Sequence, residues 1–277
     1  MINNFIYHIS FPKLNIHINL SPVAFIFGNF NVRWYGIILA IGFLLGYLYV
    51  LKHSKKFGIS KEDISNLSLI SSFFAIICAR VYYVLFYPGD FYLKNPLKIF
   101  MISEGGIAIY GAIIGGVLSI LIFSRIKKIN VWRLLDIMSL GTLIGQTIGR
   151  WGNFVNQEAF GTITNLPWGM MSENTGFKVV HPCFLYESVG CLLIFIFLHF
   201  YNRGENIKKE GNVFLLYTLF YGILRALVES LRTDSLMIPN TQFKASQVLA
   251  LILSLCSFVF ILKRNFLKRN KKTNFNE

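Results

Sequence analysis

Residues 149–161, with the sequence GRWGNFVNQEAFG, gather polar side chains that suit a phosphate ester. Arg150 carries a planar set of donors that matches a phosphate, and Asn153 and Asn156 can orient ester or hydroxyl oxygens. Glu158 can hold an arginine or a substrate hydroxyl. These residue types predict an anionic phospholipid head-group site, and the alternative is a structural cap at a helix end.

The glycines of this segment predict a turn. Gly149, Gly152 and Gly161 permit tight backbone turns, so a helix is expected to end here and to direct its polar set back toward the membrane. Gly149 also continues a four-residue spacing from Gly141 and Gly145, which lets helix backbones approach closely. The same spacing recurs in two pairs: Gly42 with Gly46, and Gly111 with Gly115.

A second polar group interrupts the apolar segment YGILRALVESLRTD. Arg225 and Glu229 are four residues apart and Arg232 is three further on, which places all three on one helix face. Tyr221 precedes them by one turn on the same face. The stripe is either part of a functional site or an ion pair that only fixes the helix orientation.

Further candidates lie at membrane depth or at the ends of apolar runs. Arg80 and Asp136 are charges inside such runs, and they either neutralise one another or contribute to a site. Tyr110 suits a packed interfacial aromatic as well as a site role. The remaining candidates are Tyr35, Glu104 and His181.

The elements that must position these residues are membrane helices. The 277-residue chain is 54% hydrophobic and only 14% charged, with a mean hydropathy of +0.54, which is far more apolar than a soluble domain. Seven apolar runs are long enough to span a bilayer. They cover residues 35–51, 66–86, 106–123, 132–148, 183–201, 212–231 and 246–263.

The basic residues indicate how these spans are oriented. Most of the 27 lysines and arginines follow the first, third, fifth and seventh runs, so the N-terminus is expected outside and the C-terminus in the cytoplasm. The net charge of +14 therefore reflects membrane topology, and nucleic-acid binding is not expected. The tail at 263–277 is expected to mark topology, with anionic lipid binding as the alternative.

We therefore expect an all-α integral membrane protein, built as one bundle of seven transmembrane helices with a small outward-facing head. An outer arm, about residues 1–34, and an outer loop, about 149–182, would form this head. The four cysteines show no metal-ligand spacing and are expected to be buried thiols. No nucleotide loop or nucleophile elbow appears in the sequence, so we expect neither metal nor cofactor.

The segment 149–161 resembles the signature of the bacterial prolipoprotein diacylglyceryl transferases, G-R-x-G-N-F-x-N-x-E-x-x-G, at every fixed position. Further blocks resemble that family in the expected order. They are RWYG at 33–36, ARVYYVLF at 79–86, EGGIAIYGAIIGG at 104–116, HPCFLYES at 181–188 and RALVESLRTD at 225–234. The family's location in the inner membrane and its seven-helix, N-out arrangement agree with the expected topology.

The resemblance implies transfer of the diacylglyceryl group from phosphatidylglycerol to the lipobox cysteine of a prolipoprotein signal peptide, with release of glycerol phosphate. Arg150 and Arg225 would bind the phosphate, with Arg225 held by Glu229. Arg232 would steer the lipid or hold the outer gate. The head-group pocket would be shaped by Asn153, Asn156 and Glu158, with support from Glu104, Asp136 and His181.

Two tyrosines would belong to the catalytic set. Tyr35 matches a family tyrosine considered important for activity. Tyr110 stands where many family members have a histidine that has been proposed as the general base, and a tyrosine is a poor base unless nearby cations lower its pKa. The residue that takes the thiol proton stays open, with Tyr110 and His181 as the candidates.

Two other functions remain as alternatives. A transporter or flippase would use Arg225, Glu229 and Asp136 as a polar pathway across the membrane. A non-catalytic lipid-binding or scaffold protein would keep the topology but tolerate changes at Arg150.

Overall fold

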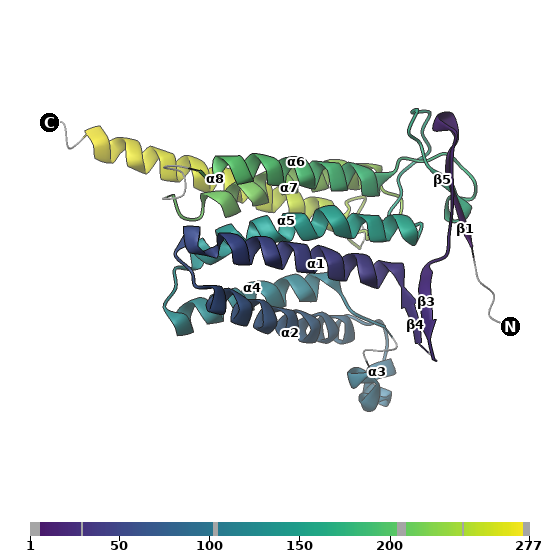
Figure 1. Cartoon of the computed structure of the whole chain (residues 1–277), viewed down its shortest axis with the longest axis horizontal. Coiled ribbons are helices and arrows are strands. Elements are labelled where there is room, and N and C mark those ends of the chain that lie inside the picture. Colours follow the sequence, from purple (N-terminus) through teal and green to yellow (C-terminus); the bar gives the residue numbers. More distant parts are fainter. Residues whose placement is uncertain (1–5, 29, 102–104, 204–208, 240, 274–277) are drawn as a thin grey trace. The chain divides into compact units, whose positions relative to one another are not determined.

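The computed structural model describes the whole chain except residues 1–5, 29, 102–104, 204–208, 240 and 274–277 (Figure 1). It divides into two compact units, each described here by itself. The first comprises Met1–Leu48 and Met138–Glu277, and the second comprises Tyr49–Ile137. Two long helices, α1 (Trp34–His53) and α5 (Val131–Val155), run from one unit into the other.

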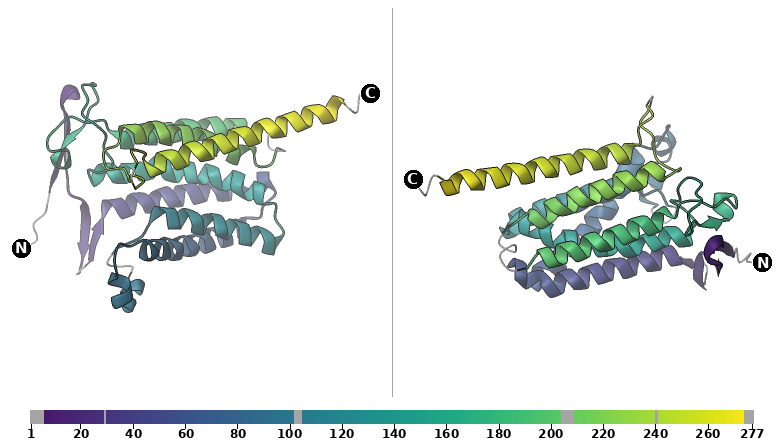
Figure 2. Two further views of the ribbon diagram at one scale, coloured as in Figure 1. Left: turned by 180° about the vertical axis from the view of Figure 1, so that it is seen from behind. Right: turned by 90° about the horizontal axis from the view of Figure 1, so that it is seen from above.

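The first unit is a group of long helices with small β-sheets at the end where α5 finishes. Its other helices are α6 (Cys183–Tyr201), α7 (Asn212–Leu231) and α8 (Ala245–Thr273). Helix α7 packs against both α6 and α8, and Figure 2 shows α8 lying along α7. The strands are β1 (Tyr7–Phe11), β2 (Ile16–Leu20), β3 (Val23–Phe27), β4 (Phe30–Arg33) and β5 (Met171–Ser172), with 3₁₀ turns at Pro12–Leu14 and Glu173–Thr175.

The second unit is built on the pair α2 (Lys61–Leu85) and α4 (Ile109–Lys127). Helix α2 starts at Ser60, whose side-chain oxygen accepts a hydrogen bond from the Asp63 amide at 2.9 Å, as expected of an N-cap. Along the chain, α2 is followed by α3 (Phe91–Lys94) and a 3₁₀ turn at Pro96–Phe100, which lead to α4. A further 3₁₀ turn, Ser54–Phe57, precedes α2.

Six helices in the described part of the chain are long and apolar enough to cross a membrane. They coincide with six of the seven predicted runs: Trp34–Phe57, Lys61–Leu85, Ile109–Lys127, Cys183–Tyr201, Asn212–Leu231 and Ala245–Arg264. The remaining run, 132–148, lies in α5, whose hydropathy is lowered by polar residues such as Asp136 and Gln146. The chain is thus a mostly helical, multi-pass membrane protein.

The predicted outer arm differs from the expectation of an all-α chain because it forms strands. Strand β1 pairs antiparallel with β2 and also with β5, so Ile9 lies opposite Ser172. Ile9 is 1% exposed and belongs to a buried cluster with Phe154 and Phe184. This apolar cluster attaches the first strand of the chain to the end of α5 and the start of α6.

A polar contact reinforces this attachment. Glu173 accepts hydrogen bonds from the His8 amide at 2.7 Å and from Gln157 Nε2 at 2.6 Å. Burial alone would raise the pKa of the Glu173 carboxyl, but these hydrogen bonds outweigh it and hold the pKa below its ordinary value. Gln157 belongs to the segment 149–161 and is fully buried, so the N-terminal strand and this segment are held together.

The prediction that Gly149 and Gly152 make a turn is wrong, because α5 continues to Val155. Both glycines instead let α1 approach α5: a Cβ at Gly152 would lie 2.8 Å from the Tyr35 ring, and one at Gly149 would lie 3.2 Å from Leu39. The turn after the helix is made by Gln157 and Ala159, both of which have positive φ.

The predicted close packing at the other glycines is confirmed. A Cβ at Gly46 would lie 2.6 Å from the Gly141 carbonyl oxygen, so α1 and α5 approach backbone to backbone. In the second unit, a Cβ at Gly111 would collide with the Cys78 carbonyl of α2. Gly116, on the same helix as Gly111, has open space around it.

The cysteines match the sequence prediction in part. All four are free thiols, and Cys183 and Cys191 are buried as expected. Cys78 is half-buried, whereas Cys256 is exposed on α8, so the prediction of burial is wrong for Cys256.

The contrast between two glycines of α4 gives a test of helix packing in the second unit. We expect Gly111→Ala to destabilise the protein by about 1–3 kcal/mol, because the added methyl group collides with the α2 backbone. Gly116→Ala is the matched control, and it should be neutral or stabilising because alanine favours helix and the site is open. Thermal unfolding in detergent measures both, and equal midpoints for the two variants would contradict this account.

Candidate active site

The centre of the candidate site is a single carboxylate, Glu187 of α6, whose side chain is 2% exposed. Its Oε1 forms an ion pair with Arg150 Nη2 from α5, and its Oε2 lies 2.9 Å from Arg225 Nη1 of α7. The Tyr221 hydroxyl donates a hydrogen bond to Oε1 at 3.0 Å. One carboxylate therefore joins three helices and holds two guanidinium groups beside each other.

The polar stripe of α7 is confirmed as a set of contacts on one helix face. Arg225 Nη2 lies 2.6 Å from Glu229 Oε2, one turn along the helix. Glu229 Oε1 accepts a hydrogen bond from Ser246 Oγ of α8 at 2.5 Å, and Arg232 Nη1 lies 3.9 Å from Oε2. We call Arg150, Glu187, Arg225 and Glu229 the ionic cluster.

The polar residues of the segment 149–161 extend this cluster. Arg150 Nη1 donates to Asn153 Oδ1 at 3.3 Å, and Asn153 Nδ2 donates to Glu158 Oε1 at 2.8 Å. Asn156 Nδ2 approaches the same oxygen at 3.5 Å. The four residues thus form a continuous chain of polar contacts, and their joint role at a head group stays a prediction.

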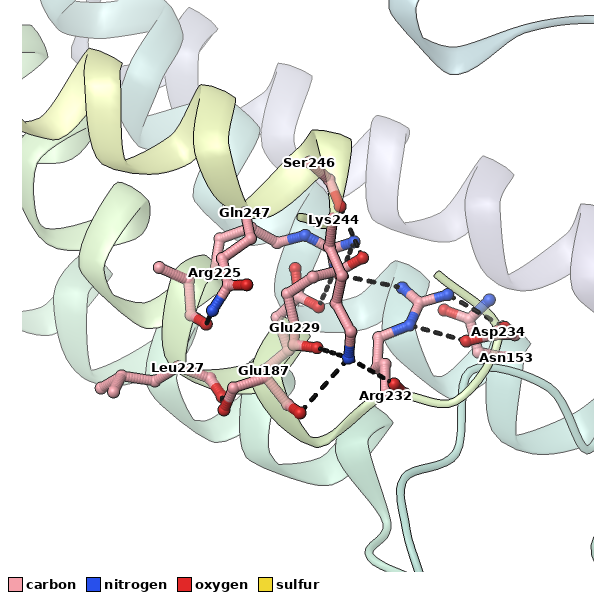
Figure 3. A network of polar contacts seen from close by, with 12 residues as sticks. Asn153, Glu187, Arg225, Leu227, Glu229, Arg232, Asp234, Lys244, Ser246 and Gln247 are labelled. Carbon is pink, nitrogen blue, oxygen red and sulfur yellow. Dashed lines mark hydrogen bonds and ion pairs between the residues drawn. The ribbon is translucent and has the colours of Figure 1, made fainter. Parts of the chain in front are cut away.

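Just beyond the ionic cluster, at the C-terminal end of α7, Arg232 forms a two-point contact with Asp234. Arg232 Nε and Nη2 lie 3.0 Å from the two carboxylate oxygens, which is the parallel geometry typical of arginine with a carboxylate (Figure 3). Burial alone would raise the pKa of the Asp234 carboxyl, but the hydrogen bonds and charge of Arg232 outweigh it and hold the pKa below its ordinary value.

Backbone contacts bring the two polar segments together. Gly161 pairs with Arg232 as an antiparallel bridge, and the Thr162 amide donates to the Leu231 carbonyl at 2.9 Å. A Cβ at Gly161 would lie 2.8 Å from His181 Cβ and 3.1 Å from the Leu231 carbonyl oxygen, so the close approach depends on a residue without a side chain. The last glycine of the segment 149–161 therefore fixes the end of α7.

Two sequence candidates lie beside the ionic cluster rather than in it. The Tyr35 ring packs over Gly152, one turn or less from Arg150 on α5. His181 Nδ1 is 3.1 Å from the Tyr186 hydroxyl, which accepts a hydrogen bond from Trp168 Nε1 at 2.9 Å. These contacts favour a structural role for His181 at the start of α6.

Other candidates belong to the second unit. Arg80 does not neutralise Asp136, because its guanidinium donates instead to backbone carbonyls around the Pro96–Phe100 turn and the start of α4. The acceptors are Lys98, Ile99, Met101, Gly105 and Gly106. Asp136 is 3% exposed in α5, and the Tyr110 ring lies 6.1 Å from that of Tyr82. Glu104 lies outside the described residues.

Sequence reasoning missed Glu187 as a site residue. It lies in the recognised block HPCFLYES, but no basic residue stands three or four positions away to mark it as half of an ion pair. Its location inside an apolar run was a usable signal, because an ionisable residue at membrane depth needs a partner. Lys244 and Ser246, at the start of α8, were also missed.

The apolar helices and the ionic cluster around the buried Glu187 define an integral membrane protein with a charged site between helices. The sequence model of the prolipoprotein diacylglyceryl transferase family matches residues 22–263. The chain therefore belongs to this family, and it is a multi-pass bacterial membrane protein. In the described residues, no group of three or more histidine, cysteine or acidic side chains could hold a metal ion.

Similar proteins extend along nearly the whole chain. A protein of Clostridioides difficile is 42% identical over 247 residues, which cover 89% of this chain and 97% of that protein. A protein of Finegoldia magna is 40% identical over 253 residues, covering 91% of this chain and 100% of that protein. A protein of Listeria welshimeri is 42% identical over 260 residues, covering 91% and 92%. Each is named phosphatidylglycerol–prolipoprotein diacylglyceryl transferase.

Removing the central carboxylate should weaken the fold strongly. We expect Glu187→Gln to destabilise the protein by about 3–5 kcal/mol, because two half-buried arginines lose the buried carboxylate that they share. Lys127→Met is the control, since it removes an ion pair with Asp63 whose side chains are 44% and 23% exposed, and it should cost under about 1 kcal/mol. Unfolding in mixed detergent micelles measures both variants, and a Glu187→Gln protein as stable as the control would refute the central role of Glu187.

Proposed function

We propose that this chain transfers the diacylglyceryl group of phosphatidylglycerol to the lipobox cysteine of a prolipoprotein. Family membership supports the reaction. The location of the active site is inferred from one observation: the guanidiniums of Arg150 and Arg225 both pair with one buried carboxylate, Glu187. The cysteine sulfur would attack the carbon of the diacylglyceryl group that bears the phosphate. The new carbon–sulfur bond replaces the carbon–oxygen bond, the electron pair leaves with glycerol phosphate, and the thiol proton is lost to a base.

The two arginines suit the leaving group of this reaction. Negative charge grows on the phosphate as the carbon–oxygen bond breaks, and fixed guanidinium donors stabilise such charge best where water is scarce. Glu187 would hold the planes of Arg150 and Arg225 in place, so little reorganisation accompanies bond breaking. Glu229 would maintain the orientation of Arg225 from the other side.

The remaining polar residues suit recognition of the lipid head group. Asn153, Asn156 and Glu158 offer amide and carboxylate groups beside Arg150 that would orient the glycerol hydroxyls of the head group. Arg232, with Asp234 beside it, would guide the anionic lipid toward Arg225. We assign Tyr35 to the same site because its ring packs on Gly152 of the Arg150 helix.

We further propose that α5 is a seventh membrane helix and that the chain lies in the cytoplasmic membrane with its N-terminus outside and its C-terminus inside. The support is the distribution of basic residues between the apolar runs. The strands and the segment 149–161 would then form an outward-facing head, with the site open to the outer leaflet. Asp136 and Glu104 remain supporting candidates from the family resemblance.

The transporter alternative is not favoured. Its polar pathway required Asp136 to act with the α7 stripe, yet Arg225 and Glu229 are paired with each other and with Glu187. Similar proteins that cover nearly the whole chain are named as transferases.

The proposed function is tested by reconstituting the purified protein in vesicles with phosphatidylglycerol and a lipobox peptide. We expect mass spectrometry to show the cysteine gaining a diacylglyceryl group. Arg150→Ala should abolish transfer, and Arg150→Lys should reduce it at least tenfold, because lysine lacks the planar donor pair even though it retains the charge that Glu187 needs.

Arg203→Ala, which changes an exposed arginine between α6 and α7, is the control and should keep normal activity. Wild-type protein that leaves the peptide unmodified would refute the transferase, and solute flux through the vesicles would favour a transporter. Near-normal turnover of folded Arg150→Ala would remove Arg150 from the site.

Tyr110 offers a test of the proton acceptor in the proposed reaction. If Tyr110, as its phenolate, takes the thiol proton, Tyr110→Phe should abolish transfer, whereas Tyr110→His should be active, with activity that rises as pH passes the pKa of histidine. The rate of peptide modification between pH 5 and 9 measures both variants. Full activity of Tyr110→Phe would exclude the hydroxyl as the base.

A further inference from the structure

The end of α7 is held by a lysine that the proposed reaction does not use. Lys244, the residue before α8, points its half-buried side chain at the last turn of α7 (Figure 3). Its Nζ donates to the carbonyl oxygens of Glu229 at 2.7 Å, Ser230 at 3.3 Å and Arg232 at 2.6 Å. An ammonium group has three protons to donate, so this arrangement matches its capacity.

These acceptors are the carbonyls that a helix leaves without partners at its C-terminus. The Glu229 carbonyl receives the Arg232 amide, and the Leu231 carbonyl receives the Thr162 amide. Lys244 supplies the donor for Ser230 and Arg232, so each carbonyl from 229 to 232 has a partner. Its positive charge also opposes the negative end of the helix dipole.

Lys244 holds the last turn of α7 without pairing with the carboxylates of the site. Its contacts are with neutral backbone oxygens, which leaves Glu229 and Asp234 to their arginines. The neighbouring residues act on the same end of α7: Ser246 donates to the Glu229 side chain, and Gln247 Nε2 donates to the Ala226 carbonyl, one turn earlier, at 3.1 Å. The start of α8 therefore fixes the backbone and the side chains of the α7 end together.

The backbone changes direction where Lys244 binds. Arg232 leaves the helix with an extended conformation, φ −66° and ψ 143°, and this sends its side chain toward Asp234. The segment then returns to α8 through a bridge between Met237 and Lys244 and a hydrogen bond from the Ala245 amide to the Leu236 carbonyl at 2.9 Å. Lys244 thus holds the end of this segment, where α8 begins, against the turn that contains Arg232.

We propose that Lys244 is a positioning residue for the anionic lipid substrate: it locks the last turn of α7 so that Arg232 and the Glu229-bound Arg225 face the lipid phosphate. This inference rests on the proposed function. It assigns to Lys244 no contact with the lipid and no role in proton transfer.

The test compares Lys244→Met and Lys244→Arg with wild type in vesicles of graded phosphatidylglycerol content. We expect Lys244→Met to raise the KM for phosphatidylglycerol about tenfold, with an unchanged KM for the lipobox peptide, because only the lipid-facing arginines lose their alignment. Lys244→Arg should recover most of the loss, since a guanidinium can also donate to several carbonyls. Lys178→Met, an exposed lysine of the same unit, is the matched control and should behave as wild type.

Amide hydrogen exchange of the peptide spanning 229–236 provides a readout that does not depend on activity, and it should speed up in Lys244→Met but not in Lys178→Met. The proposal is overturned if exchange is unchanged, or if Lys244→Met loses only folded protein while its KM for phosphatidylglycerol stays normal. Equal impairment of Lys244→Met and Lys244→Arg would also overturn it. Wild-type protein without transferase activity would refute the proposed function, and the exchange measurement would still decide whether Lys244 locks the turn.

Discussion

The shared carboxylate of Glu187 is the interaction on which the arrangement of the first unit depends. Two arginines on different helices, α5 and α7, both reach this one side chain of α6. Charges of this kind are costly away from water, and an unpartnered arginine at a helix centre costs about 2.5–3.5 kcal/mol on insertion scales. The three helices are therefore held in one register, since sliding any of them would separate a buried charge from its partner.

The surrounding structure supports that register from outside the helices. The N-terminal strand is tied to the end of α5 through Gln157 and Glu173, and the segment after α5 is tied to the end of α7 through Gly161. Lys244 closes the same end from the α8 side. The residues proposed to bind the lipid thus lie on a backbone that is held by hydrogen bonds from several segments. Such a rigid backbone is what preorganised charge stabilisation requires.

What the sequence could predict was local. Seven apolar runs were predicted to span the membrane, and six of them coincide with helices of suitable length and hydropathy, because both are properties of a continuous segment. The Arg225–Glu229 pair was predicted because both residues lie on one helix face. Glu187 was not predicted as the central partner, because its arginines are 37 and 38 residues away and only the fold brings them together. The strand pairing of Ile9 with Ser172 was missed for the same reason.

Prediction from local sequence also failed for glycine, which occurs both in turns and where helices pack closely. Gly149 and Gly152 were predicted to make a turn, but they lie inside α5 and leave room for the side chains of Leu39 and Tyr35. The four-residue spacing had predicted close packing at Gly149 but not at Gly152. A glycine in a turn and a glycine under a packed side chain look alike in the sequence, because what separates them is a neighbour from another helix. The motif blocks and their order predicted the function better than the spacing of residues within any one segment. Each block includes residues that contact another block only in the folded protein.

The order of these residues along the chain has a consequence for membrane insertion. Arg150 is synthesised 37 residues before Glu187, which at about 5–20 residues per second corresponds to a delay of roughly 2–7 seconds. During that interval the charged end of α5 has no carboxylate from α6 to neutralise it. If α5 spans the membrane, as proposed, its charged end would stay at the lipid–water boundary during this interval, and the arrival of α6 would supply the carboxylate that lets Arg150 lie between helices.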